Sequence, residues 1–304
     1  ASNPGYNPND LMGDSAEETW ANLQEQEGQP LVNHAGAETL PPGSIFKIIT
    51  TAAGLNNGFD PSSTLTGSNV ITLPDTVTEL TNYANQKCNG QDAVTLQTAF
   101  ALSCNTAFVE MSEQLGADEL RKYAKAFGVG ENYDLGVSTS AGTLGDLPDG
   151  AATAQSAIGQ RDVTMTALQA AVMAGTVANK GTRMQPYLVN RITDAQMKDV
   201  RTTKPKKADQ AVNEETAATL TDLMYASERS SWGYDGNGFA SKTGTAEHGE
   251  GLAPHVWYVA FDPERDIAVG VVVKNGGNLG ESATGGKVSG PIGRAILRAY
   301  QGEQ

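Results

Sequence analysis

The chain has 304 residues and a formal net charge of −14, and 39% of its residues are hydrophobic. This length can bury a sizeable core in one large domain or two small ones. The sequence has no dense stripe of Lys and Arg, which argues against a nucleic-acid partner, because phosphate contacts need clustered cations. No stretch approaches the ~18 apolar residues that a membrane-spanning helix needs.

Two further features limit the possible functions. One basic run, residues 198–207, is predicted to be a solvated loop rather than a binding patch. The histidines lie far apart in the sequence, and no group of Cys and His has the spacing of metal ligands. We therefore expect neither a metal nor a cofactor.

Apolar residues at helical spacing predict most of the secondary structure. The expected helices are residues 16–26, 44–56, 95–116, 118–127, 164–179, 214–228 and 290–300. Ser103 and Asn105 are polar residues that could interrupt the third of these. Residues 60–92 are rich in turn-forming residues, and residues 131–157 are predicted to be loop.

Three strands are predicted between the last two helices. They are residues 238–246, 255–262 and 267–274, and the turn sequence Pro-Glu-Arg-Asp at 263–266 joins the last two as an antiparallel hairpin. Helices come first, then an antiparallel sheet, then a closing helix. This order predicts an α+β fold with segregated layers rather than repeated βαβ units.

Ser44 and Lys47 form the first candidate for chemistry, in the sequence S-I-F-K after Pro42 and Gly43. On a helix, residues i and i+3 share a face, so the Lys47 amine would lie close to the Ser44 hydroxyl. A desolvated Lys can take the proton from a Ser and make it nucleophilic. Such a tetrapeptide also arises by chance, as a capping Ser and a surface Lys.

Ser103 and Asn105 form the second candidate, inside the apolar run 98–111. Buried polar side chains need hydrogen-bond partners, so these two should face a cleft or each other. A helix kink with locally satisfied bonds is the simpler alternative.

The third candidate is the strand segment S-K-T-G-T-A at 241–246. Alternation along a strand places Thr243 and Thr245 on one face. Gly244 has no side chain, so a substrate backbone could approach it closely. Two hydroxyls beside Lys242 suit a carboxylate, although an ordinary edge strand has the same pattern.

Together and in this order, the three segments resemble the S-x-x-K, S-x-N and K-T-G motifs of penicillin-binding proteins and class A β-lactamases. The resemblance implies a β-lactamase/transpeptidase-like α+β fold. In that fold an antiparallel sheet is flanked by an all-helical subregion, and the active site lies between them.

Two longer segments narrow the resemblance to class B penicillin-binding proteins, closest to the penicillin-binding protein A type. The opening sequence N-P-G-Y-N-P-N-D resembles their segment before the nucleophile helix, and residues 157–189 resemble their G-Q-G…T-P-L-Q…A-N-x-G…P motif. Arg161 stands where that motif usually has Gly, and Ala167 where it often has Pro. Residues 1–304 are expected to be the transpeptidase domain, a fragment without the family's membrane anchor and pedestal domain.

The resemblance also implies roles for the motif residues. Ser44 would be the acylated nucleophile and Lys47 its general base. Ser103 would pass a proton to the leaving amine, while Asn105 would bond Lys47 and the substrate amide. The K-T-G segment would hold the terminal carboxylate, and the backbone N–H groups of Ser44 and Thr245 would form the oxyanion hole.

The implied reaction is cross-linking of peptidoglycan stem peptides that end in D-Ala-D-Ala, through a Ser44 acyl-enzyme and with release of D-Ala. β-Lactams would bind covalently, and cell-wall synthesis and division proteins would be partners. The domain would act on the extracytoplasmic face of the membrane, which it would reach only through the absent anchor.

Cys88 and Cys104 are the only cysteines, and an even, sparse count allows one disulfide or two buried thiols. The resemblance favours the disulfide, because the family's catalytic domain works outside the membrane, where disulfides persist. His248 and His255 invite a search for a Ser-His-Asp triad, but Lys47 already fills the role of the base.

Three alternatives remain. A β-lactamase of class A needs an E-x-x-L-N glutamate, and no such string lies between Ser103 and Lys242; the nearest acidic loop, residues 131–135, does not match. A D,D-carboxypeptidase would use water as acceptor, and residues 157–189 argue weakly against it. A non-catalytic β-lactam sensor would keep the acylation residues, so the motifs discriminate poorly against it.

Overall fold

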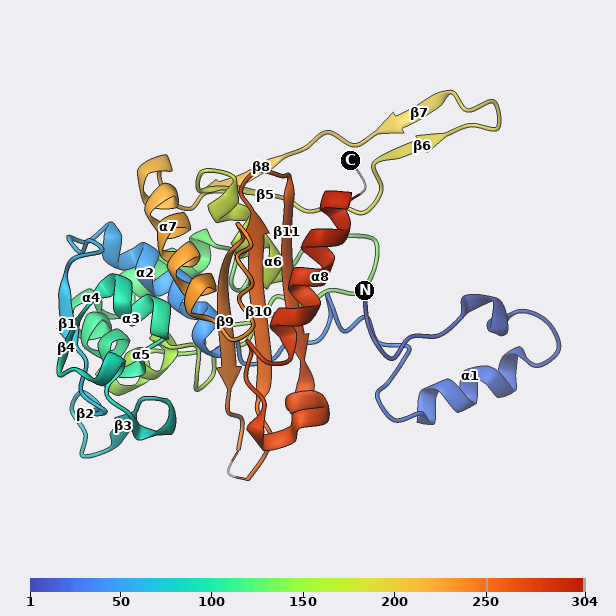
Figure 1. The fold of residues 1–304 in the computed structure, drawn as a ribbon. Coiled ribbons are helices and arrows are strands. Elements are labelled where there is room, and N and C mark those ends of the chain that lie inside the picture. Colours follow the sequence, from blue (N-terminus) through green and yellow to red (C-terminus); the bar gives the residue numbers. More distant parts are fainter. Residues whose placement is uncertain (250, 303–304) are drawn as a thin grey trace.

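A three-stranded antiparallel sheet forms the centre of the computed structural model, which describes residues 1–249 and 251–302 (Figure 1). Its strands are β9 (Ala240–Ala246), β10 (His255–Asp262) and β11 (Ile267–Val273), in the order β11-β10-β9. Every residue of the central strand β10 is buried. Among the described residues β9 pairs only with β10, so its other edge is available to the rest of the molecule.

Helices cover both faces of this sheet. The C-terminal helix α8 (Ser289–Gly302) packs on β10 and β11 on one face, and α6 (Ala167–Ala178) packs on the same two strands on the other. The packing is close because glycines lie at the contacts. Gly293 of α8 lies against the ring of Tyr258, and Gly270 of β11 lies against the backbone of α6.

The remaining large helices form a separate layer beside β9. They are α2 (Lys47–Leu55), α3 (Leu96–Leu102), α4 (Asn105–Ala126), α5 (Gly150–Ala157) and α7 (Glu214–Ser230). Helix α7 packs against β9, α2 and α3, so it joins the helical layer to the sheet. One hydrophobic cluster runs through α2, α3, α4, α6, α7 and β10. The predicted α+β class, with an antiparallel sheet beside a helical region, is therefore confirmed.

Short elements fill the connections. The strands are β1 (Thr64–Thr66), β2 (Val70–Thr72), β3 (Glu79–Thr81), β4 (Ala93–Thr95), β5 (Thr182–Met184), β6 (Arg191–Thr193), β7 (Asp199–Thr202) and β8 (Lys207–Gln210). The 3-10 helices are η1 (Pro8–Leu11), η2 (Gly43–Phe46), η3 (Tyr83–Asn85), η4 (Cys88–Gly90) and η5 (Lys274–Ser282). The small strands pair as β1-β4, β2-β3, β5-β8 and β6-β7.

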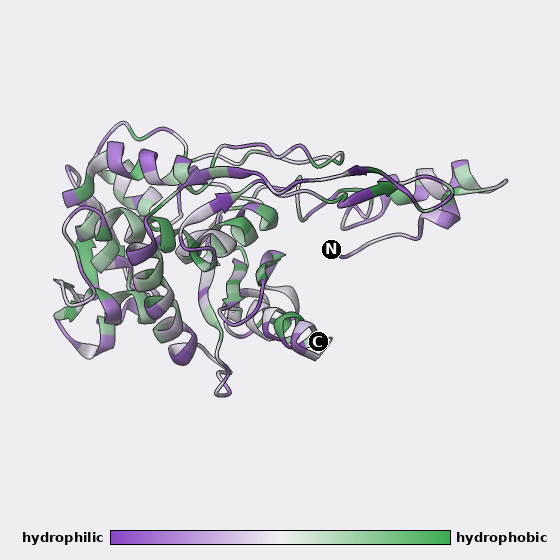
Figure 2. Cartoon of the chain, turned by 90° about the horizontal axis from the view of Figure 1, so that it is seen from above, coloured by the Kyte–Doolittle hydropathy of each residue, from purple (hydrophilic) through white to green (hydrophobic). Residues whose placement is uncertain are grey.

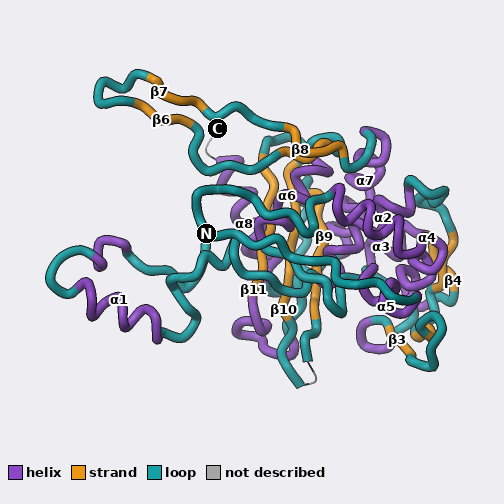
Figure 3. The backbone as a smooth tube through the Cα atoms, turned by 180° about the vertical axis from the view of Figure 1, so that it is seen from behind, coloured by secondary structure: helices purple, strands orange, loops and turns teal. Residues whose placement is uncertain are grey.

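Two segments project from the body on the same side. One is the N-terminal arm with α1 (Ala16–Glu25), and the other is the β6–β7 hairpin, as the ribbon and the view from behind both show (Figures 1 and 3). The view from above, coloured by hydropathy, shows both extending well beyond the sheet (Figure 2). Neither segment contributes a residue of the three motifs.

The elements depart from the sequence prediction in several places. Helix α5 lies inside residues 131–157, which were predicted to be loop. Its alanine-rich sequence has no apolar periodicity that would predict a helix. The helix is stabilised instead by packing on α4 and by the Asp149 side chain, which accepts from the Ala152 N–H at the helix N-terminus. The basic run is solvated as predicted, but it holds β7 and the start of β8. Residues 60–92 contain three short strands.

Within the described residues, none of the helices combines the length and the apolar character that crossing a membrane requires.

Gly270 provides a test of the sheet–helix packing. A Cβ at this position would lie 2.6 Å from the backbone nitrogen of Ala171, which cannot move without shifting α6. We expect Gly270→Ala to lower the free energy of unfolding by about 1–3 kcal/mol, the usual cost of overpacking. The matched control is Gly238→Ala, where a Cβ would meet nothing within 4 Å. Equal unfolding free energies of the two variants in urea titrations would contradict this account.

Candidate active site

Ser44 lies in the 3-10 turn η2, and Lys47 is the first residue of α2. The turn was predicted to be α-helical, but the Lys47 N–H reaches back to the Ser44 carbonyl in a 3-10 bond. In a 3-10 helix, side chains at i and i+3 eclipse one another. The tighter turn therefore aligns Ser44 and Lys47 more directly than an α-helix would.

Two glycines place this turn against the sheet. Gly43 has a φ of +54° and Gly159 a φ of +74°, a region that favours glycine. The Gly43 N–H donates to the Gly159 carbonyl at 2.9 Å. A Cβ on Gly43 would lie 2.8 Å from the carbonyl oxygen of Thr245, so the η2 turn is in close contact with β9.

The two departures from the family motif have a structural explanation. Arg161 has a φ of +62°, which accounts for the Gly usual at this position, and it pairs with Asp162 at 3.1 Å. Ala167 is the first residue of α6, a position that suits Pro because its N–H is not used in the helix. Thr166 and Gln169 cap that helix reciprocally, so the start of the helix is defined without Pro.

Ser103 ends α3 in the left-handed conformation, with φ 62° and ψ 39°. Asn105 then begins α4, so the predicted interruption of this helix is confirmed and both side chains lie at the break. Between them, Cys104 forms a disulfide with Cys88, with the Cα atoms 5.7 Å apart. The disulfide joins the break to the η4 segment.

Asn105 is held by two contacts that fix the direction of its amide. Its Nδ2 donates to the Thr81 carbonyl at 3.1 Å, and its Oδ1 accepts from Lys47 Nζ at 2.7 Å. Asn82, the residue after Thr81, is buried, and its side chain bonds Thr106 and the Ser68 carbonyl. The sequence analysis missed Thr81 and Asn82, because they lie in a turn-rich segment and belong to no motif.

The Lys47 amine is fully buried and lies between the two residues of the second motif. Besides Asn105, it donates to the Ser103 carbonyl at 2.8 Å and lies 3.4 Å from Ser103 Oγ. Burial, and then the nearby Lys242, lower the pKa of Lys47 well below its ordinary value. A neutral amine in this place can accept a proton, as a general base must.

Lys242 reaches the same point from the sheet. Its Nζ donates to Ser103 Oγ at 2.9 Å and to the Thr243 carbonyl at 3.1 Å. Burial lowers the pKa of Lys242 to about 7. Ser103 Oγ is thus shared by two buried amines, one from the helical layer and one from β9. The sequence analysis had assigned Lys242 to a carboxylate and had not foreseen this link.

The other residues of the third motif divide between the two faces of β9. Thr243 and Thr245 share one face as predicted, and Thr245 Oγ1 accepts from the Gly285 N–H at 3.5 Å. Lys242 and Gly244 share the other. A Cβ on Gly244 would lie 2.8 Å from the Pro42 carbonyl oxygen and 3.1 Å from Trp257 Cβ. Gly244 therefore makes room for the η2 turn, and the close approach of a substrate backbone stays a prediction.

His248 and His255 stack on each other with ring centroids 3.9 Å apart. His248 Nε2 donates to the Ala253 carbonyl, and His255 Nδ1 accepts from the Asn275 N–H. Burial, followed by the His248 and Lys274 charges, lowers the pKa of His255 to about 4. In the described part of the chain, neither ring bonds Ser44.

These groups can perform acyl transfer. The half-buried Ser44 hydroxyl forms no hydrogen bond to any described residue, and it lies in a turn aligned with a buried amine. Ser103 Oγ links that amine to a second one. The three motifs, which lie far apart in the sequence, meet between the helical layer and the sheet, as the sequence analysis expected.

The depressed pKa of Lys242 has a measurable consequence for stability. Between pH 7 and 10.5 the folded protein has lost this proton and the unfolded chain has kept it, so stability rises with pH in that window. We expect Lys242→Met to reduce the slope of unfolding free energy against pH by about 1.4 kcal/mol per pH unit above pH 7. Urea titrations between pH 7.5 and 9 measure it. The control Lys125→Met removes an exposed amine and should keep the wild-type slope; an unchanged slope in Lys242→Met would contradict the burial argument.

Comparisons with known proteins agree with this geometry. The chain is 43% identical over 97% of its length to the peptidoglycan D,D-transpeptidase PbpA of Mycolicibacterium smegmatis, and 41% identical over 99% to that of Mycobacterium tuberculosis. A solved penicillin G acyl-enzyme complex of penicillin-binding protein A from M. tuberculosis superposes with a TM-score of 0.93 at 41% identity. That match covers 99% of this chain and 71% of that one.

The chain spans only 62% and 64% of the length of these two relatives. A family model described as the penicillin binding protein transpeptidase domain matches residues 1–298. That match, the three motifs brought together and the fold lead to one assignment: the chain belongs to the penicillin-binding protein transpeptidase domain family.

Proposed function

We propose that the chain is a serine D,D-transpeptidase that cross-links peptidoglycan stem peptides through a Ser44 acyl-enzyme. The observation that carries the proposal is the position of the Lys47 amine. It is buried, its pKa is lowered, and Ser103 and Asn105 hold it next to the turn that contains Ser44. It gives the hydroxyl a base without a histidine. The family and the names of the relatives support the same reaction.

In the proposed reaction the Ser44 oxygen attacks the carbonyl between the two terminal D-Ala residues, and its proton passes to the neutral Lys47 amine. The backbone N–H groups of Ser44 and Thr245 stabilise the oxyanion. The C–N bond then breaks, and the proton taken up by Lys47 passes through Ser103 to the departing D-Ala amine. The contact of Ser103 Oγ with both Lys47 and Lys242 supports this relay. Attack by an acceptor amine on the ester completes the cross-link and restores Ser44.

Substrate binding is assigned to the third motif. Lys242, Thr243 and Thr245 would hold the terminal carboxylate, and Asn105 would bond the substrate amide. β-Lactams would enter the same site and acylate Ser44. Support comes from the solved relative from M. tuberculosis, which is described as a penicillin G acyl-enzyme complex.

The setting of the reaction is also a proposal. We infer that residues 1–304 are one transpeptidase domain of a longer, membrane-anchored protein that works on the extracytoplasmic face with other cell-wall synthesis and division proteins. The Cys88–Cys104 disulfide supports an oxidising compartment, since disulfides rarely persist in the cytosol. The greater length of the relatives supports the presence of further parts.

Ser44→Ala tests the nucleophile. We expect it to abolish covalent labelling by a fluorescent penicillin while leaving the thermal unfolding midpoint within a few degrees of wild type, because only one half-buried hydroxyl is lost. Peptide mapping by mass spectrometry locates the label. The control Ser15→Ala removes an exposed hydroxyl that forms no cap bond and should label normally. Stoichiometric labelling of Ser44→Ala would show that another residue is acylated.

The lifetime of the penicillin adduct separates a transpeptidase from a β-lactamase. Fast hydrolysis needs a positioned base for the attacking water. The sequence holds no E-x-x-L-N glutamate, and Lys47 is already placed for acylation. We expect the ester to persist for tens of minutes to hours. A turnover of 1 s⁻¹ corresponds to a barrier of ~17 kcal/mol, and a lifetime of hours adds ~5 kcal/mol.

Intact mass after removal of free penicillin follows that adduct. Its loss within seconds, with penicilloate accumulating over many turnovers, would establish a β-lactamase instead. Release of D-Ala from a stem peptide, measured with and without an added acceptor amine, distinguishes the remaining alternatives. D-Ala release at the same rate with and without the amine indicates a carboxypeptidase, and no release at all indicates a sensor.

A further inference from the structure

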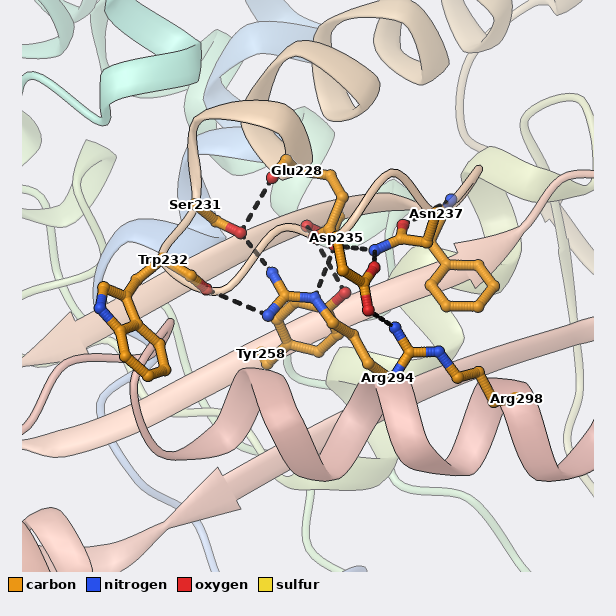
Figure 4. A network of polar contacts seen from close by, with 10 residues as sticks. Glu228, Ser231, Trp232, Asp235, Asn237, Tyr258, Arg294 and Arg298 are labelled. Atoms are coloured by element: carbon orange, nitrogen blue, oxygen red, sulfur yellow. Dashed lines mark hydrogen bonds and ion pairs between the residues drawn. The ribbon is translucent and has the colours of Figure 1, made fainter.

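A buried polar network joins α7 and α8 to the sheet (Figure 4). Its centre is Glu228, a fully buried carboxylate near the end of α7. Arg294 of α8 donates to Glu228 Oε1 at 2.7 Å, and Asn237 donates to the same oxygen at 2.9 Å. No step of the proposed reaction uses any of these groups.

The other carboxylate oxygen binds the sheet. Glu228 Oε2 accepts from Tyr258 OH of β10 at 3.0 Å and from Ser241 Oγ of β9 in a short hydrogen bond. Burial by itself would raise the pKa of Glu228, but the bonds from Arg294, Ser241 and Asn237 outweigh it and lower the pKa. The group is therefore a satisfied carboxylate that joins α7, α8 and two strands.

Ser241 is the residue immediately before Lys242. Neighbours on a strand point to opposite faces, so Ser241 binds Glu228 on one face while Lys242 binds Ser103 on the other. β9 is an edge strand with backbone pairing on one side only. The Ser241–Glu228 bond therefore adds a side-chain attachment to a strand whose outer edge has no backbone partner in the sheet.

The same attachment reaches the helical layer. Helix α7, which carries Glu228, packs against both β9 and α3. Ser103 is the residue that ends α3. The distance from Lys242 Nζ to Ser103 Oγ thus depends on how α7 holds β9 relative to α3.

We propose that Glu228 and Ser241 are positioning residues that hold Lys242 at Ser103. They act through the strand rather than on the substrate, and the inference rests on the proposed Ser44 acylation. Without the Ser241 hydroxyl, β9 can shift along its free edge, the contact with Ser103 loosens and water reaches the Lys242 amine. Acylation then slows, and the pKa of Lys242 rises toward its ordinary value.

Ser241→Ala and Tyr258→Phe form a matched pair for the test. Each removes one hydroxyl donor to Glu228 Oε2, and each leaves the carboxylate with three donors. Both variants should therefore fold, with similar losses in unfolding midpoint. Only Ser241 lies on β9 next to Lys242, whereas Tyr258 is on β10 and belongs to no motif.

The measurement is the second-order rate of Ser44 acylation by a fluorescent penicillin, recorded from pH 5.5 to 9. We expect Ser241→Ala to lower the rate about tenfold at pH 7 and to move the acidic limb of the profile to higher pH. The acylation rate of Tyr258→Phe should stay within about twofold of wild type, and the acidic limb of its pH profile should not move. A purely structural role would not shift the limb.

Two results would overturn the inference: Ser241→Ala acylating at the wild-type rate with the wild-type profile, or both variants slowing equally with unmoved limbs. Failure of the wild-type protein to label at Ser44 is a different outcome. It would remove the proposed function itself, and the positioning role with it.

Discussion

Two lysine amines meet at one serine hydroxyl in the interior of this protein, and the rest of the site is arranged around that contact. Lys47 and Lys242 are both fully buried, and both approach Ser103 Oγ. Two ammonium ions could not share such a place, because burial and mutual repulsion both disfavour the charge. The depressed pKa values follow, and they give the site an amine able to accept a proton near neutral pH.

The fold maintains this contact by bringing its parts from different layers. Ser103 sits at a left-handed break between two helices, which the disulfide at Cys104 ties to a neighbouring segment. Lys242 comes from an edge strand. Lys47 begins α2, directly after the 3-10 turn η2, which two glycines place against that strand. A catalytic group placed by several independent elements keeps its geometry better than one on a loop.

The departures from the family motif show which features of that motif are structural. Arg161 occupies a backbone conformation that glycine enters more easily, and Ala167 begins a helix that a reciprocal cap already defines. Both residues lie in the segment that contacts the η2 turn through Gly159, and neither belongs to the three motifs. Gly159 is kept, because any Cβ there would meet the Gly43 carbonyl.

The three motifs, the main helices and the antiparallel hairpin could be predicted from the sequence, because they depend on local spacing and period. Only the folded chain shows that Lys242 meets Ser103, that Thr81 orients Asn105, and that Gly244 accommodates the η2 turn. Helix α5 also needed its packing against α4 to be recognised. Glu228 is the last residue of the predicted helix 214–228, and no motif or pattern in the sequence indicates that it is buried. Its burial follows from the packing of α7, α8 and the sheet around it. These segments lie far apart in the chain, so their contacts leave no periodic pattern in the sequence.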